Sequence, residues 1–84
     1  MTKVVFRKWK DGAVIALFPD YTNPHDRTVT SYMHIGQHGD ADYRYVISTT
    51  HPAQPNEYRD LLAELITTSY ADLHVVQRAR PNFH

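Results

Sequence analysis

The sequence predicts an α+β fold in which a three-stranded antiparallel meander carries one or two helices on one face and ends in a C-terminal edge strand. Two apolar runs flank an Asp-Gly pair at residues 11–12, the dipeptide that most strongly favours a tight hairpin turn. Apolar side chains then recur with helical spacing over 58–66, and a last apolar run follows at 73–79. Because 84 residues without cysteine allow one small core, we expect a single domain over residues 1–84.

The first two strands are predicted on either side of the Asp-Gly turn. Residues 3–10 (KVVFRKWK) are rich in β-branched and aromatic side chains, which favour strands. Residues 13–18 (AVIALF) are apolar throughout, as is typical of a central strand covered on both faces or of one whose second face meets a partner. Pro19 is expected to end this strand, and the Asn, Asp and Pro of residues 20–27 predict an exposed loop.

The middle of the chain supplies a third strand and a segment with two interpretations. Residues 28–35 (TVTSYMHI) alternate between the two faces of a strand and complete the meander, and Gly36 ends the alternation. Residues 40–50 could form a strand or a helix. The spacing of their apolar side chains favours a short helix with Asp40 as its N-cap.

The main helix is predicted to begin near Pro55. Pro55 suits the first turn, where its missing N–H has no intrahelical partner, and the carboxylate of Glu57 complements the positive end of the helix dipole. The apolar stripe consists of Tyr58, Leu61, Leu62, Leu65 and Ile66. The last four are expected to pack against Val4 or Val5, Ile15, Leu17, Val29 and Val75.

Charge and hydropathy disfavour two classes of partner. Nine basic and nine acidic side chains balance, whereas nucleic-acid binders usually carry a basic surplus. The N-terminus lacks the apolar region of a signal peptide, and the apolar run at 13–18 is far shorter than the ~20 residues that span a bilayer. We therefore expect a soluble cytoplasmic protein with no membrane partner and no nucleic-acid partner.

The stretch SYMHIGQHGDADY, residues 31–43, holds the most distinctive pattern. His34 and His38 flank a glycine, and with Asp40 they could ligate a metal ion, because imidazole is the commonest transition-metal ligand. This spacing of histidines is characteristic only on a helix, which Gly36 disfavours. The favoured interpretation is a turn in which Gly36 and Gly39 adopt backbone angles that other residues resist, so that valine at either position should destabilise the fold.

No nucleophile elbow, phosphate loop or dinucleotide fingerprint is present, so we expect a protein that is not an enzyme and needs no cofactor. Tyrosine, tryptophan and arginine are enriched in interface hot spots, and this chain has six tyrosines. The leading hypothesis is a non-enzymatic protein-binding or self-associating module that uses an exposed edge strand or the second face of the sheet. Its candidate binding residues are Trp9, Tyr32, His34, Gln37 and His38. The alternative is a metal-binding protein or small hydrolase centred on His34 and His38.

SYMHIGQHG (31–39) and EYRDLLAEL (57–65) together resemble segments of small uncharacterised proteins from bacterial genomes, phages and other mobile elements. The resemblance implies an accessory protein of bacterial or phage type and brings no assigned activity. It directs attention to His34, Gln37 and His38.

Overall fold

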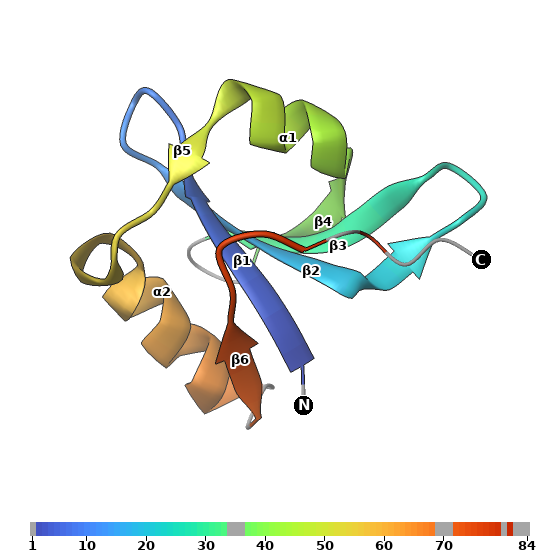
Figure 1. Ribbon diagram of the computed structural model, residues 1–84. Helices are drawn as coiled ribbons and strands as arrows, with labels where there is room; N and C mark the ends of the chain where they lie inside the picture. The colour runs from blue at the N-terminus through green and yellow to red at the C-terminus, as the bar shows by residue number, and fades with distance from the viewer. Residues whose placement is uncertain (1, 34–36, 69–71, 80, 82–84) are drawn as a thin grey trace.

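The computed structural model describes residues 2–33, 37–68, 72–79 and 81 (Figure 1). Its elements in chain order are β1 (Thr2–Lys8), β2 (Val14–Asn23), β3 (Thr28–Met33), β4 (Gln37–Ala41), α1 (Tyr43–Thr49), β5 (His51–Pro52), α2 (Pro55–Thr68) and β6 (Leu73–Val75). The predicted α+β class is confirmed, with an antiparallel meander, two helices and a C-terminal strand at the sheet edge.

The sheet has the strand order β4-β3-β2-β1-β5, with each neighbouring pair antiparallel. β6 pairs in parallel with the start of β1, while β5 pairs with its end, so both short strands lie along the same side of β1. The meander has four strands rather than three, because Gln37–Ala41 pairs with β3 in continuous register. Only three residues of the strand predicted at 73–79 belong to β6.

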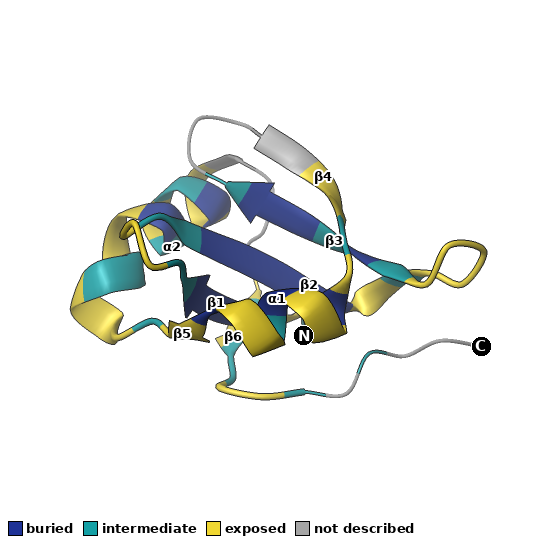
Figure 2. Cartoon of the chain, turned by 90° about the horizontal axis from the view of Figure 1, so that it is seen from above, coloured by how far each residue is buried: buried dark blue, intermediate teal, exposed yellow. Residues whose placement is uncertain are grey.

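Both faces of the sheet are covered, each by one helix (Figure 2). The face under α2 is formed by Val4, Phe6, Ala16, Phe18 and Tyr32. The face under α1 is formed by Val5, Ile15, Leu17 and Val29. The apolar run of β2 is therefore buried on both sides, as predicted. The two helices do not share a face, and α2 does not pack on Ile15, Leu17 or Val29.

β2 continues past Pro19, where the sequence predicted its end. The register between β2 and β3 shifts between Phe18 and Thr22, which marks a bulge or a similar irregularity of the ladder. A bulge accommodates proline because the ladder hydrogen bond that proline cannot donate is not needed there. The strand therefore extends to Asn23, and the predicted loop shrinks to the turn that precedes Thr28.

The short helix favoured for residues 40–50 is present as α1, but its N-cap is Asp42 and not Asp40. The Asp42 side chain accepts a hydrogen bond from the backbone N–H of Tyr45 at 3.2 Å. Asp40 lies two residues earlier, in β4 opposite Thr30. The cap is displaced because the fourth strand occupies the residues where the helix was expected to begin.

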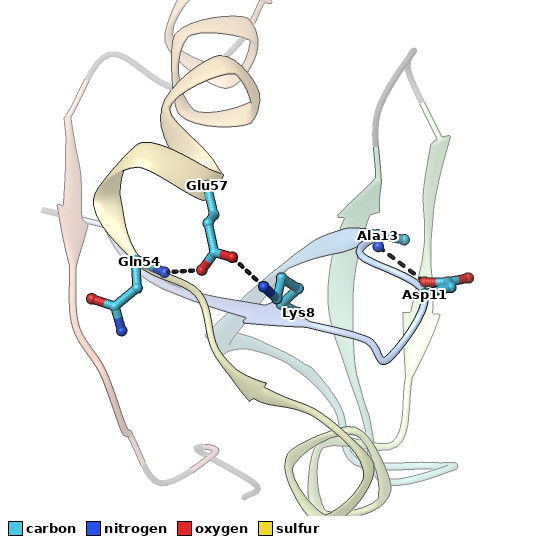
Figure 3. Close-up of polar contacts among 5 residues, drawn as sticks. All are labelled: Lys8, Asp11, Ala13, Gln54 and Glu57. Carbon is cyan, nitrogen blue, oxygen red and sulfur yellow. Dashed lines mark hydrogen bonds and ion pairs between the residues drawn. The ribbon is translucent and has the colours of Figure 1, made fainter.

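α2 begins at Pro55, and Glu57 secures its first turn to the sheet (Figure 3). The Glu57 carboxylate accepts a hydrogen bond from the Gln54 N–H at 2.8 Å and forms an ion pair with Lys8 of β1. The hydrogen bond from Lys8, followed by that from the Gln54 backbone, holds the pKa of Glu57 below its ordinary value. These contacts orient α2 so that Tyr58 stacks on Phe6, with ring centroids 4.4 Å apart.

Gly12 adopts a backbone conformation that favours glycine, whereas Gly39 does not. Gly12 has a φ of +94° in the β1–β2 turn. Gly39 lies inside β4 without a positive φ, and a Cβ there would meet only the Ser31 hydroxyl at 3.7 Å, an ordinary contact. The expectation that Gly39 needs a special backbone is therefore wrong, and Gly36 lies outside the described residues.

Gly12→Val is expected to lower the free energy of unfolding by ~1–2 kcal/mol, because it forces a β-branched residue into the left-handed region. Gly39→Val should change it by less than ~0.5 kcal/mol, since valine suits a strand. Urea unfolding of both variants beside the parent measures the difference. Equal losses would contradict the assignment of Gly39 to a regular strand.

Candidate functional site

The stretch singled out in the sequence lies at one edge of the sheet. Ser31 is buried in β3, Gln37 and His38 pair with β3 as residues of β4, and His34 is outside the described residues. In this ladder Gln37 lies opposite Met33 and His38 lies opposite Tyr32. The stretch is therefore mainly a strand pair that leads into α1.

The two aromatic residues predicted for binding both contribute to packing. Tyr32 is only 1% exposed and belongs to the core under α2, so its ring is not available to a partner. Trp9 is half-buried and packs against the core on the α1 face. The binding role of the other three candidate residues, His34, Gln37 and His38, stays a prediction.

The metal alternative finds no ligand cluster in the part of the chain that the structure describes. No three His, Cys, Asp or Glu side chains come close enough there to hold one ion. Asp40 is exposed on β4, and His34, which the hypothesis requires, is not among the described residues. Metal binding by His34, His38 and Asp40 stays a prediction from sequence.

β4 is the open edge of the sheet. It pairs on one side with β3, and no other described strand lies along its other side. Figure 2 shows it at the margin of the molecule, beyond β3. At the opposite margin the edge is formed by β5, with two residues, and β6, with three residues. β4, with five residues, is thus the longest unpaired strand edge in the described structure.

Arg7 is a buried cation that the sequence analysis did not single out. It is 5% exposed and lies on the α1 face of β1, where its guanidinium donates hydrogen bonds to the Thr50 hydroxyl at 2.9 Å and to the carbonyls of Ile47 and Thr50 at 2.9 and 2.7 Å. These carbonyls end α1 and have no helical partner. Arg7 therefore caps the helix from the sheet.

A groove of about 470 Å³ runs between α1 and the segment after β6. Its lining is formed by Tyr43, Arg44, Ile47, Arg78, Ala79 and Pro81. After β6 the chain crosses to the α1 face, where Val76 and Ala79 pack against the core (Figure 1). The Ala79 N–H donates a hydrogen bond to the Tyr43 hydroxyl at 3.2 Å, which ties the two walls together.

Arg78 is close enough to Arg7 to influence its pKa. Burial lowers the pKa of the Arg7 guanidinium, the interaction with Tyr43 raises it, and the positive charge of Arg78 lowers it. No described carboxylate forms an ion pair with Arg7, Arg44 or Arg78. Sequence reasoning missed this cluster because its members are separated by more than thirty residues, although strand alternation, which places Arg7 on the same face as Val5, is a signal that could have indicated Arg7.

No protein-family model, curated protein or solved structure matches this chain. The resemblance to bacterial and phage proteins accordingly stays a prediction. Among the described residues, neither helix is long and apolar enough to cross a membrane.

Proposed function

We propose that the protein is a small protein-binding accessory module that pairs the open edge of β4 with a strand of another chain. The observation that supports this is the position of β4, whose outer side meets no described strand. The unpaired N–H and C=O groups of such an edge are a template for a further strand. Main-chain hydrogen bonds then supply the affinity, as in other cases of strand addition.

The partner we propose is a second copy of this chain. Two identical strands can pair antiparallel about a two-fold axis, which gives a closed and self-complementary interface. A register centred on Gly39 would place position 38, a histidine, opposite Asp40 of the second copy, and the same pair would recur by symmetry. A register centred on Asp40 would oppose two carboxylates, which is unfavourable between directly paired positions.

The absence of cysteine from the chain allows a sharp test of this register. Paired strand positions bring Cα atoms ~5.5 Å apart, within the range that a disulfide can span. Gly39→Cys should therefore form a disulfide-linked dimer rapidly under mild oxidation by glutathione. Ala63→Cys is the matched control, because Ala63 is also small and exposed but lies on α2. Sedimentation of the parent protein should show a dimer at high micromolar concentration.

A strictly monomeric parent protein would contradict the proposal, as would equal rates of cross-linking for the two cysteine variants. Dimerisation of the parent with slow cross-linking at position 39 would reject the pairing of β4 centred on Gly39. Circular dichroism of both variants before oxidation confirms that each has the fold of the parent.

A further inference from the structure

We propose that the groove between α1 and the segment after β6 binds an extended acidic segment of a partner protein, with carboxylates at Arg44 and Arg78 and an apolar side chain on Ile47, Ala79 and Pro81. The groove contains no residue of β4, so binding there does not depend on strand pairing.

The described residues that line the groove include two arginines and no carboxylate, although the whole chain is neutral. Arg44 and Arg78 are exposed at its margins, and Arg7 lies buried behind α1. Arg44 also borders a smaller cavity with Asp26 and Asp42, but neither carboxylate forms an ion pair with it and neither lines the groove. Asp42 caps α1, and Asp26 accepts a hydrogen bond from the Thr28 hydroxyl at 2.7 Å. The groove therefore presents a local positive field that attracts carboxylates.

The floor of the groove is apolar, which gives a ligand more than charge to bind. Ile47, Ala79 and Pro81 are half-buried, and the ring of Tyr43 is buried between α1 and the crossing segment. Buried apolar contact at the centre with charged groups at the margin is the usual anatomy of a protein interface. A phosphate backbone would use the two arginines but not this floor.

The exposure of both arginines favours a peptide over a small molecule. Small-molecule sites bury most of the ligand surface, whereas this groove, as formed by the described residues, is bounded by a two-turn helix and one chain segment and is open to solvent. Its walls are held in place before any ligand arrives, because Tyr43 binds the Ala79 backbone and Arg7 fixes the end of α1. Such preorganisation lowers the entropic cost of binding.

The test is a titration of ¹⁵N-labelled protein, followed by NMR, with the capped peptide Glu-Asp-Leu-Phe-Asp-Glu. The matched neutral peptide is Gln-Asn-Leu-Phe-Asn-Gln. The acidic peptide should shift the amides of Tyr43 to Ile47 and of residues 77–79. Replacing both Arg44 and Arg78 by alanine should weaken its binding about five- to ten-fold, since each exposed ion pair contributes modestly. Arg59→Ala is the matched control, because Arg59 is exposed on α2, on the other face of the sheet.

Several outcomes would overturn the assignment. The first is that millimolar acidic peptide shifts no amide signal. The second is that the neutral peptide binds as tightly as the acidic one, and the third is that Arg59→Ala weakens peptide binding as much as the double replacement of Arg44 and Arg78. A thymidine oligonucleotide that shifts the same amides at lower concentration than the acidic peptide would assign the groove to phosphate instead. The amide spectrum of each variant, recorded without peptide, shows that its fold is retained.

Discussion

Leu65→Ala is expected to lower the free energy of unfolding by ~2–5 kcal/mol, the range for deleting a fully buried leucine side chain. Leu65 has no exposed surface and lies in the core between α2 and the sheet, with Phe6 and Phe18 in the same cluster. The substitution removes buried methyl groups and leaves a cavity that the surrounding strands cannot close, because they are fixed in register on both sides.

Ile66→Ala is the matched control for this prediction. Ile66 is the next residue of the same helix, and the sequence predicted that it too would be buried, but it is 51% exposed. Its replacement should change the free energy of unfolding by less than ~1 kcal/mol. Urea unfolding of both variants makes the comparison, and similar losses would show that α2 is rotated relative to the orientation described here.

The helical stripe of α2 was predictable because its spacing is a local property of the sequence. Which face of the sheet it covers was not, because a strand that is apolar at every position, such as AVIALF, fits either side equally well. The face is fixed by the register that pairs Phe6 with Ala16 and Ala16 with Tyr32. That register depends on contacts across the sheet, which sequence periodicity does not report.

β4 was missed for a different reason. Its residues, QHGDA, have little intrinsic preference for strands, and glycine and aspartate are depleted in them. The segment becomes a strand because its backbone pairs with β3 from Val29 to Met33. Gly39, which the sequence analysis interpreted as a turn residue, thus belongs to an edge strand.

The arginine groove could not be derived from the sequence, since it is assembled by tertiary structure alone. Arg44 and Arg78 line the same groove only because the segment after β6 crosses to the α1 face. Balanced total charge, from which the sequence analysis argued against a nucleic-acid partner, does not exclude a local excess of one sign.

Arg7→Met is expected to lower the free energy of unfolding by ~2–4 kcal/mol, because methionine fills much of the same space but donates no hydrogen bonds. The Ile47 and Thr50 carbonyls would lose a charged donor, and the Thr50 hydroxyl, which donates its own proton to Val46, would lose the group that donates to it. The favourable interaction between the guanidinium and the negative end of α1 is also lost.

Arg7→Lys separates the role of the charge from the role of the planar guanidinium. Lysine keeps the positive charge but cannot reproduce the fork that reaches the Thr50 hydroxyl and both carbonyls. The free energy of unfolding of Arg7→Lys should therefore lie between that of Arg7→Met and that of the parent. Hydrogen exchange provides the second measurement, and both variants should accelerate exchange in Tyr43–Thr49 more than in Pro55–Thr68. The hydrogen bonds of Arg7 go to the end of α1 and not to α2. Equal acceleration of hydrogen exchange in both helices would therefore contradict its role as the cap of α1.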